Sequence, residues 1–289
     1  MAIQSPTPKT ATNVGAALPR IDGPLKVTGK AQYTSDHRFP GMLIAVPVCA
    51  TIANGAVQRI DTAKASAMPG VKMIYTHENI GRFYRAGSTA RIDERRPPME
   101  DTTIRYYGQY IALVVADNFE QANAAAAAIK VDYRTEQPDV GRHLSLSAGE
   151  KPKVDSLRGD PDAAFAAGPV TLDYTYTTPI ETHNPIELHA SVAVYDGQNF
   201  TLFETSQAIV NHQATMTEML GVQPENVRII MQYLGSGFGG KLWPWTHSLL
   251  AAMAARNLQR PIKLVVSRDM MFHNVGHRTN TQQRIRLSA

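Results

Sequence analysis

NVRIIMQYLGSGFGGKLWPW, residues 226–245, contains in order the patterns of a strand, a glycine-rich turn and a helix. Apolar residues alternate with polar ones and predict a strand from Val227 to Leu234. Glycines dominate the next six positions, so few side chains keep a ligand away from the backbone. The apolar spacing becomes helical from about Pro244, a residue suited to a first helical turn. The stretch therefore predicts a row of backbone N–H groups at a helix start, which is suited to binding an anion.

Two nucleotide-binding motifs match this loop incompletely. Gly235, Gly237 and Gly240 satisfy G-x-G-x-x-G, but the dinucleotide fingerprint also needs an acid about 20 residues later, and the next acid is Asp269. The same loop reads G-x-x-x-x-G-K, but Leu242 stands where a P-loop has the Ser or Thr that holds magnesium. A tight turn whose glycines serve only packing is the third alternative.

A resemblance to a known family supplies a more specific interpretation. LGSGFGGK, preceded by TSQAIVNHQATMTEMLGVQPENVRII, resembles the molybdopterin-binding region of the xanthine dehydrogenase and aldehyde oxidase family. In that family a Gly-Phe pair within GGGFGGK contacts the pterin, and a glutamine upstream lies beside the oxo ligand of the metal. The resemblance implies cofactor binding by Gln207, Gly237, Phe238 and Gly239. Ser236 stands where the family has the second glycine of its triplet.

The start of the chain resembles the same family. RIDGPLKVTGKAQYTSD, residues 20–36, and the later IDTAKASAMPGVKMIYTHENI are similar to the family's α/β hammerhead domain, and the similarity is closest to bacterial aldehyde oxidases of the periplasmic type. The implied fold is α+β. It comprises a disordered or extended lead-in over 1–19, the hammerhead domain over 20–137, a connecting segment over 138–168, and the N-terminal, incomplete part of the molybdopterin-binding domain over 169–289.

Periodicity places further elements along the chain. Strands are predicted at 41–50, 71–76, 111–117, 170–178, 191–196, 200–205 and 261–267, and those between 170 and 205 have the pattern of antiparallel neighbours. Helices are predicted at 119–133, with Asn118 as N-cap, and at 208–222, ended by Gly221. The polar stretch 81–103 is predicted to be a long loop. Its arginines fit a solvated face or a contact to a phosphate or a partner; they are Arg82, Arg85, Arg91, Arg95 and Arg96.

Composition excludes several classes of function. The 289 residues carry a net charge of +4 with dispersed basic residues, which does not favour nucleic-acid binding. The single cysteine, Cys49, excludes an internal disulfide and a four-cysteine iron–sulfur cluster on this chain. No apolar run reaches 18 residues, so no membrane span is predicted. The N-terminus has no secretory pattern, which predicts a cytoplasmic location, or a periplasmic one by co-export with a signal-bearing partner subunit.

Histidines occur before the glycine loop and again near the end of the chain: His183, His189, His212, His273 and His277. The last two are four residues apart, but no third ligand accompanies them in a segment that does not have a helical pattern. We therefore predict no metal ligated directly by the protein, and in the resembling family the pterin holds the molybdenum. His183, Asn184 and Glu187 are candidate pocket residues, with core or turn roles as the alternative.

The resemblance implies a molybdenum-cofactor-binding subunit of a hydroxylase that oxidises aldehydes to carboxylic acids with water as oxygen source. Its cofactor would be molybdopterin in the cytosine dinucleotide form, with iron–sulfur clusters and FAD on partner subunits. The general-base glutamate is expected beyond residue 289, so no catalytic residue is assigned here and the chain alone is predicted to be inactive. Leu242 stands where xanthine-oxidising members carry a glutamate, which favours aldehydes over purines. The alternatives are an N-heterocycle hydroxylase subunit of isoquinoline or xanthine type and an inactive fragment with a scaffold role.

Overall fold

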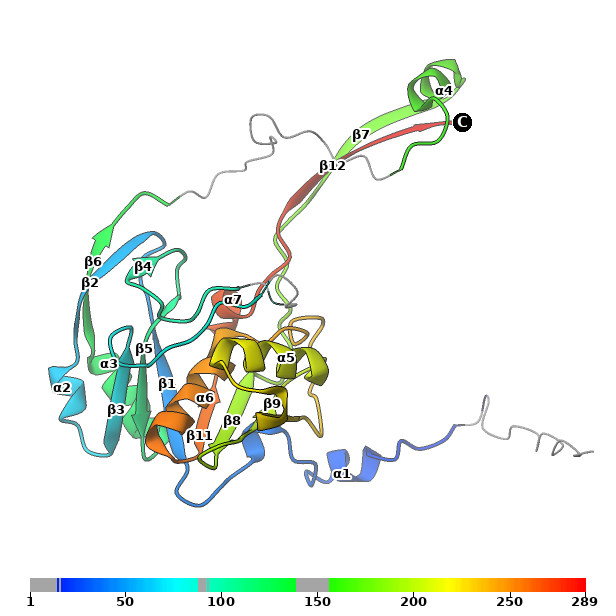
Figure 1. Ribbon diagram of the computed structural model, residues 1–289. Helices are drawn as coiled ribbons and strands as arrows, with labels where there is room; N and C mark the ends of the chain where they lie inside the picture. The colour runs from blue at the N-terminus through cyan, green and yellow to red at the C-terminus, as the bar shows by residue number, and fades with distance from the viewer. Residues whose placement is uncertain (1–14, 16, 88–91, 93, 139–155) are drawn as a thin grey trace, which may run out of the picture.

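A mixed seven-stranded sheet forms the centre of the molecule (Figure 1). The structure, a computed structural model, describes residues 15, 17–87, 92, 94–138 and 156–289. The strand order is β10-β9-β8-β11-β1-β5-β3, with β1 at Leu43–Cys49, β3 at Val71–Thr76, β5 at Tyr110–Ala116, β8 at Ala190–Tyr195, β9 at Phe200–Glu204, β10 at Val227–Ile230 and β11 at Ile262–Val265. β1 pairs with β11 in parallel and with β5 in antiparallel orientation. One continuous sheet therefore joins the two regions that the sequence predicts as separate domains.

Helices cover both faces of this sheet. They are α2 at Ala63–Ser66, α3 at Phe119–Ala128, α5 at Ile209–Leu220 and α6 at Thr246–Leu258. Side chains alternate between the faces of a strand. In β5, Leu113 and Val115 join the larger core, which contains most of α6. Val114 and Ala116 instead pack with the alanines of α3. The central strand is thus buried on both sides, and the candidate site lies on the α5–α6 side.

A second, three-stranded sheet corrects one prediction. It consists of β2 at Gly55–Asp61, β4 at Thr103–Ile104 and β6 at Lys130–Thr135, in the order β4-β2-β6. The predicted N-cap is confirmed, because Asn118 Oδ1 accepts a hydrogen bond of 2.9 Å from the Gln121 N–H. The predicted helix ends early, however, because Val131 and Tyr133 pack as alternate residues of β6 beside Val57.

A two-stranded ribbon projects from the body, with a short helix at its tip (Figure 1). β7 at Thr171–Thr178 pairs with β12 at Thr281–Ser288, and the helix is α4 at Pro161–Ala167, within the predicted connecting segment. The prediction that β7 neighbours the strands after it is wrong. The register places Tyr174 opposite Ile285 and Leu172 opposite Leu287, so one face of the ribbon is apolar. All of β7 is exposed.

The remaining elements are short: α1 at Gly23–Val27, α7 at Met271–Asn274, and single 3₁₀ turns at Thr34–Asp36 and Pro224–Asn226. α7 corrects the prediction of no helix there. The predicted end of α5 is confirmed, since Gly221 adopts a φ of 65°. In the described part of the 81–103 loop, Arg85 and Arg96 pair with glutamates at 2.9 Å, whereas Arg91 lies outside the described residues. None of the helices in the described ranges has the length and apolarity needed to cross a bilayer.

Candidate cofactor site

The glycine loop follows β10, which is shorter than predicted and ends at Ile230. Three residues of the loop have left-handed conformations, with φ of 71° at Ser236, 53° at Phe238 and 93° at Gly239. Such values are uncommon for a residue with a side chain and cost free energy that the surrounding structure must offset. Phe238 also leaves 70% of its side chain exposed. A strained backbone that presents an aromatic ring to the surface indicates a functional position.

Gln207 lies against the middle of this loop, three residues after β9. Its Oε1 accepts hydrogen bonds from the N–H groups of Gly239 at 3.1 Å and Lys241 at 3.2 Å. The backbone N–H of Gln207 donates to the Lys241 carbonyl at 2.7 Å. Because both contacts to the amide come from donors, the oxygen must face the loop, and the NH₂ group faces away from it. The structure therefore brings together Gln207, Phe238 and Gly239, three residues that the sequence predicted to share a site.

Gly237 explains how the glutamine comes so close. A Cβ at this position would lie 2.3 Å from Gln207 Oε1 and 2.7 Å from its Cδ. Real Cβ atoms do not approach other atoms so closely, so a side chain here would displace the amide. Gly237 is itself buried. This glycine is needed for space rather than for backbone freedom.

A buried ion pair between Lys241 and Glu187 holds both ends of the loop in place. Lys241 Nζ lies 2.7 Å from Glu187 Oε2 and also donates to the Glu187 carbonyl at 3.0 Å. The same carboxylate oxygen accepts from the Gly235 N–H at 2.7 Å. The Lys241 side chain is fully buried, and burial lowers its pKa while the contact with Glu187 raises it. Glu187 thus has a structural role, and Lys241 cannot reach phosphates as a P-loop lysine does.

The carbonyl of Gly240 is a second anchor. It accepts a hydrogen bond from Trp245 Nε1 at 2.7 Å and lies 3.0 Å from His189 Nε2. A Cβ on Gly240 would lie 2.8 Å from the His183 ring. Burial lowers the pKa of His189 to about 4, so this imidazole is neutral and donates from Nε2. His189 therefore holds the loop at Gly240 and the His183 ring lies close to the same residue, while Asn184 Nδ2 donates to Thr182 Oγ1 at 2.8 Å.

The predicted row of N–H groups at a helix start is wrong in part. α6 begins only at Thr246, with Pro244 just before it, and the N–H groups of Gly235 and of residues 239–242 bond within the chain. Within the described residues, the N–H groups of Ser236, Gly237 and Phe238 donate no hydrogen bond. The groups that a ligand could contact are these three donors, the exposed aromatic ring and the NH₂ of Gln207.

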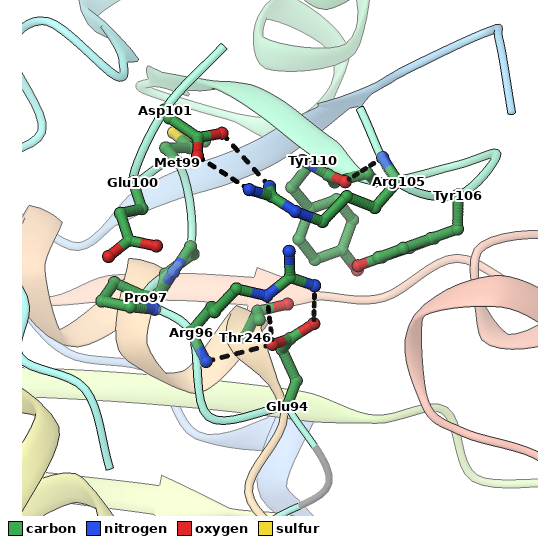
Figure 2. A pocket seen from close by; sticks show the side chains of 12 residues that line it. Glu94, Arg96, Pro97, Met99, Glu100, Asp101, Arg105, Tyr106, Tyr110 and Thr246 are labelled. Atoms are coloured by element: carbon green, nitrogen blue, oxygen red, sulfur yellow. Dashed lines mark hydrogen bonds and ion pairs between the residues drawn. The ribbon is translucent and has the colours of Figure 1, made fainter. Parts of the chain in front are cut away.

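A small cavity lies beside the start of α6, apart from the loop (Figure 2). Its volume of about 30 Å³ suits one or two water molecules. Arg96 pairs with Glu94 at 2.9 Å, and Arg105 pairs with Asp101 at 2.8 Å. Each guanidinium that faces the cavity is already neutralised by its own carboxylate. None of the predicted site residues lines the cavity, and both of its arginines pair with nearby carboxylates.

A larger pocket of about 350 Å³ adjoins it and is lined by aromatic rings, among them Tyr107, Trp245 and Phe272. His273 and His277, the pair noted for its spacing, both line this pocket. Across the described ranges, no three His, Cys, Asp or Glu side chains are placed to hold a metal ion. The pair therefore contributes to the wall of a pocket.

Sequence reasoning missed Trp245, which bonds to the loop, and Glu204, a buried acid three residues before Gln207. Glu204 occupies an inward position of β9, after Phe200 and Leu202, and it is fully buried. An acid in the apolar phase of an alternating strand was the available signal. For Trp245 the sequence held no comparable signal, because the bond from its indole to Gly240 depends on how the loop returns to α6.

Comparison with protein families identifies both halves of the chain. Residues 28–137 match the model described as aldehyde oxidase and xanthine dehydrogenase, a/b hammerhead domain. Residues 147–289 match the molybdopterin cofactor-binding domain. The two matches occur in the predicted order and together cover the body, the glycine loop and the ribbon.

Individual relatives agree. The chain is 39% identical over 282 residues to the aldehyde oxidoreductase molybdenum-binding subunit PaoC of Escherichia coli K12, which covers 96% of this chain and 38% of the relative. It is 29% identical over 262 residues to the nicotinate dehydrogenase large molybdopterin subunit of Eubacterium barkeri. This match covers 86% of this chain and 60% of the relative. The aldehyde oxidoreductase structure from Desulfovibrio gigas superposes with a TM-score of 0.78 at 26% identity, covering 94% of this chain and 32% of that one. The chain thus spans well under half of the aldehyde-oxidising relatives.

Proposed function

Because the chain belongs to the xanthine dehydrogenase and aldehyde oxidase family, we propose that its glycine loop and Gln207 bind molybdopterin within an enzyme that oxidises aldehydes. The observation that carries this proposal is Phe238, an exposed aromatic residue in a left-handed conformation beside an amide of defined orientation. The ring of Phe238 lies outside the hydrophobic core, and the NH₂ group of Gln207 faces away from the loop. Both are explained if a ligand occupies the surface that they share.

The residues present fit such a cofactor. Gly237 leaves room for Gln207 under the loop, and three unpaired N–H groups at residues 236–238 can donate to polar cofactor atoms. Phe238 would cover one side of the cofactor, and the NH₂ of Gln207 would donate to it. Molybdopterin, proposed here in its cytosine dinucleotide form, supplies the metal centre at which the aldehyde is oxidised to a carboxylic acid with oxygen from water.

Other components of the reaction are proposed to lie elsewhere. No residue of this site is placed to act as general base, since Glu187 is engaged by Lys241 and by the loop. We assign that role to a glutamate outside this chain. Cys49 alone cannot hold an iron–sulfur cluster, so electrons would leave through iron–sulfur and FAD subunits. Whether the assembled enzyme is cytoplasmic or periplasmic would depend on export with a signal-bearing partner.

The exposed β7–β12 ribbon favours the view that this chain functions within a larger assembly. An isolated two-stranded ribbon is at best marginally stable in water. Here Leu172, Tyr174, Ile285 and Leu287 expose one apolar face far from the main core. We propose that another part of the enzyme covers this face and that residues 1–289 alone are inactive.

Cofactor content tests the proposal directly. The chain is produced with its partner subunits in a bacterial host that makes molybdopterin, and metal and pterin are measured after purification. Equimolar molybdenum and pterin are expected, with severalfold less of both in Gln207→Ala, because the amide contact is lost. Gln198→Ala, in an exposed turn, is the matched control. The chain produced without partners is expected to give no aldehyde turnover. Absence of molybdenum from the assembled protein would support the rival role as an inactive scaffold.

A second candidate function is hydroxylation of a nitrogen heterocycle, which is favoured by the likeness to a nicotinate dehydrogenase subunit. Leu242 is partly exposed next to the glycine loop and offers no hydrogen bond to a heterocycle. We expect Leu242→Glu in the assembled enzyme to lower kcat/KM for aromatic aldehydes by about tenfold or more, because a charge replaces an apolar contact. The kcat/KM for purine or quinoline-type substrates should rise. Leu242→Met should leave the ratio of kcat/KM for aldehydes to kcat/KM for heterocycles unchanged. An unaltered ratio in the glutamate variant would place Leu242 outside the substrate pocket.

A further inference from the structure

A fully buried polar cluster lies between the sheet and α6, close to Gln207. It joins Glu204 at the end of β9, Ser191 in β8 and Ser248 in α6, and none of the three side chains is exposed. Ser191 Oγ lies 2.7 Å and 2.6 Å from the two carboxyl oxygens of Glu204. Ser248 Oγ lies 2.9 Å from Glu204 Oε2 and 3.1 Å from Ser191 Oγ. The three groups therefore touch one another in a closed ring, which we call the Glu204 ring.

Counting protons distinguishes the two charge states of this ring. Each hydroxyl has one proton to donate, and an ionised carboxylate has none. With Glu204 ionised, both serine protons would go to its oxygens and the 3.1 Å contact between the hydroxyls would hold no proton. With Glu204 protonated, each member donates once: Ser191 to the carboxyl, the carboxyl to Ser248, and Ser248 to Ser191. Each pair of groups is then joined by one hydrogen bond, and the fourth contact, between Ser191 Oγ and Glu204 Oε2, holds no proton of its own.

The surroundings agree with a neutral acid, because no cation faces Glu204 among the described residues. The titratable group of α5 that faces Glu204 is His212, whose Nε2 is 3.8 Å from Glu204 Oε2, too far for a hydrogen bond. Burial lowers the pKa of His212 to about 3, and it also lowers the pKa of His247 on α6 and of His189 before β8. Lys241 is engaged by Glu187. Desolvation raises the pKa of Glu204 to about 8, although its two serine contacts lower it.

The ring also adjoins the segment that presents Gln207. Residue 205 is tied to β8, since the Thr205 N–H donates to the Ala190 carbonyl at 3.2 Å and Thr205 Oγ1 accepts from the Ala190 N–H at 3.1 Å. Two residues later the Gln207 N–H donates to the Lys241 carbonyl. Glu204 is a buried anchor at the start of this segment, and its carboxyl connects the segment to Ser248 of α6. Movement of its side chain would therefore be transmitted to the amide through two residues.

We propose that Glu204 is held as a neutral carboxylic acid in this ring and acts as a positioning residue for Gln207. The role of Gln207 itself rests on the proposed function. A neutral carboxyl and a carboxamide have the same shape, and both can donate and accept at this site. Glu204→Gln should therefore preserve the ring, whereas Glu204→Ala and Ser248→Ala should open it.

Infrared spectroscopy of the full chain tests the protonation state without reference to activity. The wild-type protein should show the carbonyl band of a buried protonated carboxyl at pH values below about 8, shifted by ¹³C-glutamate and absent from Glu204→Gln. Glu225→Gln, at an exposed glutamate, should retain the band. A carboxylate band for Glu204 at neutral pH would overturn the proposal.

Stability against pH gives a second readout. The folded chain keeps this proton up to about pH 8, while the unfolded chain releases it near the ordinary value of 4.5. The contribution of protonated Glu204 to the stability of the fold is thus complete below pH 4.5 and is lost as the pH rises to about 8. The folding equilibrium of the wild type should fall relative to Glu204→Gln by about tenfold per pH unit across this window. Parallel pH profiles for the two proteins would contradict a protonated Glu204.

Cofactor content of the assembled protein tests the positioning role. Glu204→Gln should match the wild type, and Glu204→Ala and Ser248→Ala should hold severalfold less pterin and molybdenum. Full retention in both alanine variants, or a loss in Glu204→Gln as large as in Glu204→Ala, would refute positioning through the ring. If Gln207→Ala also retains its cofactor, the proposed function fails instead, and the infrared result still decides whether the acid is neutral.

Discussion

Replacing Gly237 with alanine is expected to remove most of the molybdenum and pterin from the assembled protein. The new Cβ would occupy a position 2.3 Å from Gln207 Oε1, so the amide must leave its two N–H donors on Gly239 and Lys241. The backbone of Gly237 does not have a positive φ, so alanine is not strained there for its own sake. The loss is expected to be at least as large as that of Gln207→Ala, because the methyl group also disturbs the loop.

Gly23→Ala is the matched control for this change. Gly23 also lacks a positive φ, and its added Cβ would meet only Arg20 Cβ at an ordinary 3.7 Å. Circular dichroism melts of all three proteins would show whether the fold persists. Normal cofactor content in a folded Gly237→Ala protein would mean that the contact between loop and amide does not serve cofactor binding.

Removing the partner of the buried lysine is expected to have the largest effect on stability. Glu187→Ala leaves the ammonium of Lys241 without its carboxylate and the Gly235 N–H without its acceptor. Breaking a buried ion pair by removing one partner typically costs about 3–5 kcal/mol. Urea unfolding of the full chain should show a loss of this order. The double variant Glu187→Leu with Lys241→Met should recover part of it, because no uncompensated charge then remains.

An exposed ion pair supplies the comparison. Arg85 and Glu100 are 2.9 Å apart, and the arginine side chain is 65% exposed. Such pairs contribute about 0–1 kcal/mol, so Glu100→Ala should change the free energy of unfolding little. Equal small losses for Glu187→Ala and Glu100→Ala would show that Lys241 is hydrated and does not fasten the loop.

Local sequence patterns predicted elements well where one residue determines an end. Asn118 caps α3 with its own side chain, and Gly221 ends α5 because it adopts a left-handed conformation at little cost. Alternation also located β8 and β9, which pair as antiparallel neighbours. These features depend on neighbours within a few positions, which a sequence displays directly.

Long-range pairing was not accessible in the same way. The alternation in β7 predicts a strand but does not name its partner, and β12 pairs with it across about a hundred intervening residues, as Thr178 opposite Thr281 shows. Likewise, nothing in the pattern of β1 indicates that Leu43 would pair with Ile262 and join both halves of the chain in one sheet. Such pairings are selected by packing of the whole fold.

The site was predictable in part for a similar reason. Family resemblance singled out Gln207 and Phe238 as candidates, and the structure places the loop against the Gln207 amide. The buried contact of Lys241 with Glu187 and the hydroxyls around Glu204 come from elements far apart in sequence. Their roles therefore emerge only once β8, β9 and α6 are packed together.

The position of the metal relative to Gln207 and Phe238 tests the central claim most directly. Anomalous scattering from molybdenum, measured in crystals of this chain assembled with cofactor and partner subunits, would locate it without assumptions about the ligand. We predict one molybdenum peak beside the Gln207 amide, with the pterin against Phe238 and the N–H groups of residues 236–238. A molybdenum peak elsewhere on the assembly, with the glycine loop free of cofactor, would contradict the account.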